Sequence, residues 1–280
     1  MQEISPNIFI ENVYPGVTLA VIRSRRGLLM IDSPLKIEDA RSWRSILAGM
    51  YSGFDRLLVT LDEHYDRTLG TRQMECMTAG LEALHQALRD RSVSFKTQGQ
   101  DTGAEWEFVN SLGVVRWAVP DITFTKSLNL YWEDYPVQFY AVPGPSHAAI
   151  WVELPKQKII FIGDTVISGA PPFLAAANLP AWQDAIARLL TPAFKEYKII
   201  SGRGGIVSTG EVKEQGKFLV KVQQVVDKLA GKESDAREID HACLQLLKAF
   251  DLKSSRIDQY YSRLSYGLSQ YCRQQTLAGK

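Results

Sequence analysis

The segment PGPSHAAIWVELPKQKIIFIGDTV, residues 143–166, combines a loop, two apolar strand patterns and an acidic strand end. Its loop places His147 directly before the first strand pattern, AAIWVELP. Pro155 and the polar residues after it are typical of a hairpin-like turn, and the second strand pattern runs into Asp164. Polar groups at strand ends, held by a buried sheet, are where α/β proteins build their sites. The segment therefore predicts a polar site on a sheet scaffold.

A second segment of this kind is LLVTLDEHYDRTLG, residues 57–70. A short apolar strand pattern is followed by five charged or ligand-type residues within six positions: Asp62, Glu63, His64, Asp66 and Arg67. Two further strand patterns also end on polar residues, LLMI on Asp32 and KIISG on Arg203. Because the chain has only 4 histidines, two of them at such strand ends favour convergence of these groups into one site.

The patterns along the rest of the chain predict an α/β fold with a helical tail. We expect strands within residues 7–32, a helix over 36–50, a buried strand at RLLVTL and a helix over 71–90. Strand patterns return from 121 to 166, followed by a helix over 179–190 and a strand at YKIISGRGG. From about residue 210 the chain reads as nearly all helical, and residues 91–120 have no clear pattern.

Composition limits the classes of function. The net charge of the 280-residue chain is +1, so no broad electrostatic field would attract nucleic acid or anionic lipid. No apolar run approaches the roughly 18 residues that span a membrane, and the first residues lack the pattern of a signal peptide. The 3 cysteines form no CxxC pair. We therefore expect a cytoplasmic protein with a small-molecule substrate and no nucleic-acid or membrane partner.

Taken in order, these segments resemble the metallo-β-lactamase fold superfamily. Its signature is H-x-H-x-D-H after a strand, a further histidine loop, a Gly-Asp strand end and a last histidine in a Pro-Gly-His turn. Here DEHYDRTLG, PGPSH, IIFIGD and IISGRGG stand in these places. The resemblance implies a four-layer αββα sandwich of metal-dependent hydrolases. We expect this α/β (α+β) domain over residues 1–210 and a helical extension packed on it over 211–280.

The resemblance also implies roles for individual residues. The ligand positions of the first metal fall on Asp62, His64 and His147, which still form a chemically competent set. The ligand positions of the second metal fall on Asp66, Arg67 and Arg203, and Asp164 takes the bridging position. Two of the three outer ligands of the second metal are therefore arginines.

An arginine cannot ligate a metal, because its guanidinium is protonated and has no lone pair to donate. Two carboxylates crowded together without a metal would repel, and a guanidinium can neutralise them through parallel hydrogen bonds. We therefore hypothesise that Arg67 and Arg203 stand in for the second metal and pair with Asp66 and Asp164.

Two functions of different classes follow. In the first, one divalent ion (zinc, iron or manganese) is held by Asp62, His64, His147 and Asp164, and its bound water hydrolyses a substrate. Asp66 would then accept the proton, and Arg67 or Arg203 would stabilise an oxyanion or hold an acidic substrate group. In the second, the chain is a metal-free member that binds a small molecule or a partner protein without hydrolysis. Thioester hydrolysis of the glyoxalase II type is less favoured, because that chemistry uses two metals.

The sequence leaves the substrate and the role of the tail open. Taken singly, His64 and His147 would each be explained as hydrogen-bonded structural histidines. The helical tail would either pack on the main body, where it could cover the mouth of a pocket, or form an interface between copies of the chain.

Overall fold

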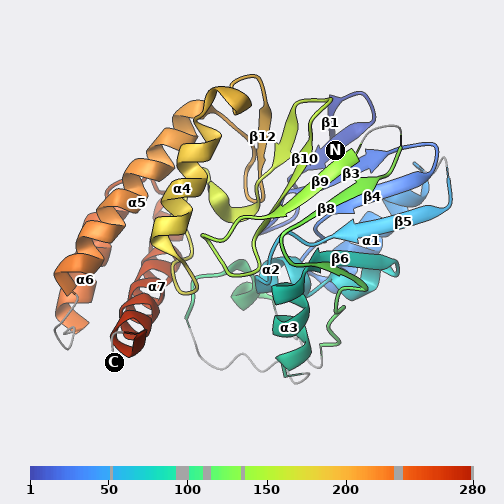
Figure 1. The fold of residues 1–280 in the computed structure, drawn as a ribbon. Helices are drawn as coiled ribbons and strands as arrows, with labels where there is room; N and C mark the ends of the chain where they lie inside the picture. Colours follow the sequence, from blue (N-terminus) through green and yellow to red (C-terminus); the bar gives the residue numbers. More distant parts are fainter. Residues whose placement is uncertain (51–52, 93–100, 110–114, 134–135, 230–235, 279–280) are drawn as a thin grey trace.

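Two mixed β-sheets lie face to face, and helices cover both outer faces (Figure 1). This arrangement comes from a computed structural model, which describes residues 1–50, 53–92, 101–109, 115–133, 136–229 and 236–278. The result is a four-layer αββα sandwich, so the predicted fold class is confirmed.

The first sheet has seven strands in chain order: β1 (Gln2–Ser5), β2 (Ile8–Glu11), β3 (Leu19–Arg23), β4 (Gly27–Ile31), β5 (Asp55–Val59), β6 (Met77–Leu81) and β7 (Ile122–Phe124). Strands β1 to β4 are antiparallel neighbours, and β4 to β7 are parallel. All five residues of β4 are buried, which explains its continuous apolar sequence.

The second sheet has six strands in the order β13 (Gly205–Val207), β12 (Lys198–Ser201), β11 (Ile159–Phe161), β10 (Ile150–Leu154), β9 (Pro136–Ala141) and β8 (Ser127–Tyr131). Only the β11–β12 pair is parallel. The carboxyl ends of these two strands therefore lie at the same edge, where Asp164 and Arg203 follow them.

Apolar side chains from the inner faces of both sheets form the central core, with Phe139 and Ile31 among the fully buried residues. Helix α1 (Ile37–Ala48) covers the first sheet through Trp43. The outer face of the second sheet packs against α4 (Leu179–Leu189), α5 (Thr209–Leu229), α6 (Ala236–Leu247) and α7 (Ile257–Ala278). Figure 1 shows these four helices together on one side of the molecule.

The C-terminal helices share one buried apolar cluster with α4 and the second sheet. This cluster crosses the expected boundary at residue 210, and the division into two domains stays a prediction.

In the described part of the chain, no helix combines the length and the apolar composition that a membrane crossing requires.

One prediction of secondary structure is wrong. Residues 71–90 are not one helix but a 3₁₀ turn (Thr71–Met74), strand β6 and helix α3 (Glu82–Asp90). The segment MTAGL has no alternation and little β-propensity, and it becomes a strand because it pairs between β5 and β7. Residues 93–100 and 110–114, which had no clear pattern, lie outside the described residues.

Candidate functional site

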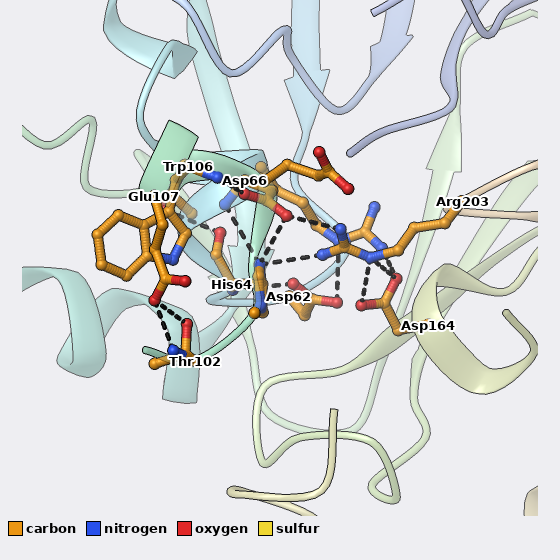
Figure 2. Close-up of polar contacts among 12 residues, drawn as sticks. Asp62, His64, Asp66, Thr102, Trp106, Glu107, Asp164 and Arg203 are labelled. Carbon is orange, nitrogen blue, oxygen red and sulfur yellow. Dashed lines mark hydrogen bonds and ion pairs between the residues drawn. The ribbon is translucent and has the colours of Figure 1, made fainter. Parts of the chain in front are cut away.

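The charged strand ends meet at one edge of the sandwich (Figure 2). Asp32 follows β4, Asp62 follows β5, Asp164 lies in the 3₁₀ turn Gly163–Thr165 after β11, and Arg203 follows β12. The short helix α2 (Tyr65–Thr68) begins after His64 and adds Asp66 and Arg67. We call the six charged residues the ion cluster: Asp32, Asp62, Asp66, Arg67, Asp164 and Arg203, all of them buried.

Arg67 lies at the centre of the ion cluster and is fully buried. Its guanidinium donates to three carboxylates: Nε to Asp62 at 2.9 Å, Nη1 to Asp32 and Nη2 to Asp164. The backbone leaves room for it, because a Cβ on Gly202 would lie 2.3 Å from Nη2 of Arg67. A residue with a side chain at position 202 would therefore displace the guanidinium.

Arg203 approaches the ion cluster from the other sheet (Figure 2). Its Nε donates to both oxygens of Asp164, at 3.1 and 2.9 Å, and its Nη1 donates to Asp66 at 2.6 Å. Its Nη2 lies 3.0 Å from Nδ1 of His64. Arg203 thus contacts both Asp66 and Asp164, as hypothesised, whereas Arg67 contacts Asp164 together with Asp32 and Asp62 in place of Asp66.

The ion cluster holds four carboxylates and two guanidiniums, so its charges do not balance when every group is ionised. Burial raises the pKa of Asp164, but Arg203 and Arg67 outweigh it and hold that pKa below its ordinary value. Burial raises the pKa of Asp62 to about 7, against the attraction of Arg67. Burial also raises the pKa of Asp32 and of Asp66. The two guanidiniums therefore favour the ionised form of Asp164, whereas burial disfavours ionisation of the other three carboxylates.

His64 is a neutral hydrogen-bond acceptor at the rim of the cluster. Its Nδ1 accepts from the backbone N–H of Asp66 at 3.2 Å, as the cap of helix α2, and faces Nη2 of Arg203. Burial, and then the positive charge of Arg203, lower the pKa of His64 well below its ordinary value. Because Nδ1 accepts, the ring proton is assigned to Nε2.

The oxygen and nitrogen atoms of this site that could ligate a metal are not arranged to hold a metal ion. A metal needs the lone pairs of Asp164, Asp66 and His64, and the guanidiniums of Arg67 and Arg203 already occupy them. A cation added there would also sit against two fixed positive charges. Among the residues that the structure describes, no group of three or more histidines, cysteines or acidic residues is placed to hold a metal.

The predicted site residues do not all come together. Asp62, His64 and Asp164 line one cavity, whereas His147 is exposed and is not part of its lining. The predicted ligand set of Asp62, His64, His147 and Asp164 therefore lacks one of its two imidazoles at the cavity, and its role in metal binding stays a prediction.

The cavity beside the ion cluster has a volume of about 400 Å³, within the range of small-molecule sites. Five aromatic side chains, Tyr65, Trp106, Trp117, Phe173 and Tyr266, contribute to its lining, together with the carboxylates of Asp62, Glu63 and Asp164. Two arginines that sequence reasoning missed also line it: Arg91, next to helix α3, and Arg263 from helix α7. Helix α7 thus forms part of the cavity wall; whether the tail covers the mouth of the pocket or forms an interface stays a prediction.

Helix α7 reaches the cavity through two close approaches. A Cβ on Gly267 would lie 3.0 Å from Cβ of Leu174, and a Cβ on Gly103 would lie 2.2 Å from the carbonyl oxygen of Gln259. Arg263 and Gly267 are four residues apart, so they lie on the same helix face. The sequence shows that these two residues share a helix face, but not that this face meets the cavity.

The fold matches solved structures at low sequence identity. The DIM-1 metallo-β-lactamase has a TM-score of 0.61 at 17% identity, covering 78% of this chain and 95% of that one. A metallo-β-lactamase from Pontibacter korlensis has a TM-score of 0.59 at 18% identity, covering 78% and 97%. The sec-alkylsulfatase Pisa1 from Pseudomonas sp. has a TM-score of 0.68 at 14% identity, covering 97% of this chain and 49% of the sulfatase.

No protein-family model matches the sequence, and no curated protein matches it. The match to the sulfatase covers nearly the whole chain, so it extends into the C-terminal helices, while this chain spans about half of the sulfatase's length. Architecture and matches agree on the fold that the sequence motifs predicted. The chain is a protein of the metallo-β-lactamase fold.

Proposed function

We propose that this chain is a metal-independent protein of the metallo-β-lactamase fold that binds a small molecule in the cavity beside the ion cluster. The observation that carries the proposal is the state of Asp164. Arg67 and Arg203 together donate three hydrogen bonds to its two oxygens, so a metal pair bridged by this carboxylate would have to displace guanidiniums.

The two guanidiniums do in the ion cluster what a divalent ion would do. They keep neighbouring carboxylates together in a buried region, where unpaired anions would be destabilising. They also fix the loops that carry His64 and Asp164, both of which line the cavity. The cavity is thus held in a binding-competent shape by ion pairs within the chain.

The competing function, hydrolysis with one metal ion, requires a rearrangement. A metal at Asp62 and Asp164 would have to displace Arg67, whose charge is then left buried. Asp32 would remain its partner, but breaking buried ion pairs of this kind costs about 3–5 kcal/mol. The geometry therefore supports binding without a metal over metal-assisted hydrolysis.

Metal analysis tests the proposal. Protein purified without chelator, then incubated with excess zinc and desalted, is expected to retain far less than one equivalent of zinc, iron or manganese. One retained equivalent that is lost in the His64→Ala variant would contradict the proposal and favour the mononuclear hydrolase. The His241→Ala variant is the matched control, because His241 lies on helix α6, away from the cavity lining.

A further inference from the structure

Arg263 is a buried cation without a carboxylate partner. It is 3% exposed, and no ion pair joins it to any residue within the described ranges. Its Nε and Nη2 donate to the carbonyl oxygen of Gly103 at 3.1 and 2.8 Å, and its Nη1 donates to that of Pro171 at 3.1 Å. A guanidinium has five N–H donors. Three are used in these bonds, so two N–H groups have no hydrogen bond among the described contacts, and the residue lines the cavity.

The surroundings of Arg263 leave its charge uncompensated. Burial, and then the nearby charge of Arg203, lower the pKa of Arg263 to about 10, so the group is still cationic at neutral pH. Asp66 and Glu105 attract the guanidinium of Arg263 without forming an ion pair with it. Their ion pairs are with other arginines: Asp66 with Arg203, and Glu105 with Arg256. A buried charge of this kind is stabilised when a ligand brings the opposite charge.

Other donors face the same cavity. The Nε2–H of His64 lies on a ring that lines the cavity and stacks on Phe173, with ring centroids 4.3 Å apart. Arg91 is also in the lining and donates to Oγ1 of Thr68 at 3.1 Å and to the carbonyl oxygen of Glu63, with no carboxylate partner in the described part of the chain. Glu63 itself accepts a hydrogen bond from Ser146 at 2.8 Å.

The aromatic wall argues against a cationic ligand. Guanidiniums already lie over these rings: Arg263 and Arg203 over Phe173 at 4.0 and 4.7 Å, and Arg91 over Tyr65 at 4.2 Å. A ligand cation would compete with them for the ring faces and be repelled by their charge. An anion with a flat apolar body avoids both penalties.

We propose that the cavity binds an organic anion with a flat apolar body, an aromatic carboxylate being the simplest example, and that Arg263 holds the anionic group. The body of the ligand lies among Trp106, Trp117 and Phe173, and the Nε2–H of His64 is a second donor to the anion. This assignment rests on the proposed function and names the ligand class for the same cavity.

Three probes of nearly equal shape test the assignment by calorimetry: 2-naphthoate, neutral 2-naphthamide and cationic 2-naphthylmethylammonium. The wild-type protein is expected to prefer the naphthoate over the amide by about tenfold or more, and to bind the cation most weakly. Equal or tighter binding of the amide or the cation would overturn the assignment.

The Arg263→Gln variant is expected to lose the preference for naphthoate over naphthamide, and Arg263→Lys is expected to retain most of it. This ratio separates a role in charge recognition from a role in packing, because a packing defect weakens both probes alike. Arg256→Gln is the matched control: it lies on the adjacent turn, pairs with Glu105, is absent from the cavity lining and should leave the ratio unchanged. A ratio that survives in Arg263→Gln would overturn the assignment.

If Arg263→Gln does not fold, the wild-type ratio and the Arg263→Lys variant decide the question. Absence of binding by all three probes at about 1 mM would also overturn the ligand class. The two proposals are contradicted by different results. One retained equivalent of metal contradicts the proposed function, whereas the binding of the three probes decides the ligand class.

Discussion

Four arginines surround the site, and they divide into two pairs with opposite surroundings. Arg67 and Arg203 lie inside the ion cluster, where each contacts two or more carboxylates. Arg91 and Arg263 lie in the cavity wall, where they contact a hydroxyl, backbone carbonyls and aromatic rings. Arginines of one site therefore differ in their partners: two are paired with carboxylates, and two contact only uncharged groups among the described residues.

The difference separates structural charge from charge that is available to a ligand. Each charged group of the ion cluster has an oppositely charged partner within the chain, so these groups fix the shape of the site and offer little to an incoming anion. The charges of the wall are satisfied as hydrogen-bond donors but are not neutralised. The following predictions test this division, beginning with the largest expected effect.

Removal of Arg67 should be far more damaging than removal of Arg263. Arg67→Met leaves Asp32, Asp62 and Asp164 without their common partner, and we expect a loss of about 3–5 kcal/mol in the free energy of unfolding. Arg263→Met leaves two carbonyl groups short of donors, and we expect about 1–3 kcal/mol. Urea unfolding of both variants measures the difference, and equal losses would show that the division is wrong.

Substitution of Gly202 tests the position of the Arg67 guanidinium without altering any charge. In Gly202→Ala the new methyl group would lie 2.3 Å from Nη2 and 2.6 Å from Nη1 of Arg67, so the ion cluster must shift. We expect a loss of about 1–3 kcal/mol in urea unfolding. Gly210→Ala is the control, since its Cβ would lie 3.5 Å from Oγ of Ser208; an equally small effect at both glycines would contradict the packing described here.

The pH dependence of stability should carry the signature of Asp62. The pKa of Asp62 is raised from 3.8 in the unfolded chain to about 7 in the folded state, so the folded state binds a proton more tightly at this carboxyl. The stabilisation that this proton provides is fully present below pH 3.8 and is lost as the pH rises to about 7. Wild-type protein should therefore lose stability relative to Asp62→Asn as pH rises from about 5 to 7, by at most about 1.4 kcal/mol per pH unit. Parallel pH profiles for the two proteins would contradict a raised pKa at Asp62.

The smallest effect is expected in the 3₁₀ turn Ser254–Arg256, just before helix α7. Arg256 pairs with Glu105, but its side chain is 43% exposed, so solvent screens the interaction. Arg256→Ala should lower the free energy of unfolding by less than about 1 kcal/mol. A larger loss, measured by urea unfolding, would mean that this ion pair belongs energetically with the cluster and not with the surface.

The sequence predicted the ion cluster better than the cavity. The resemblance of three strand-end segments to the metallo-β-lactamase motifs assigned Asp66, Arg67, Asp164 and Arg203 to one place. The strand patterns also placed Asp32 at a strand end, although its contact with Arg67 was not predicted. Strand β6 was missed because its pairing with β5 and β7, and not its composition, makes it a strand.

Arg263 could not be assigned from sequence for a different reason. It lies on a helix far along the chain from the strand-end motifs, and helical periodicity states which residues share a face but not which loop that face meets. The contacts that place it, with the carbonyl groups of Gly103 and Pro171, are long-range contacts of the tertiary structure. His147 shows the converse limit, because motif position alone did not bring it to the cavity wall.

The most direct test of the central claim is a crystal structure of the protein grown with excess zinc, with anomalous data collected at the zinc edge. The account predicts that the guanidinium of Arg67 stays within about 3 Å of Asp164 and that no anomalous peak appears beside that carboxylate. An anomalous peak coordinated by Asp62, His64 and Asp164, with Arg67 turned away, would contradict it.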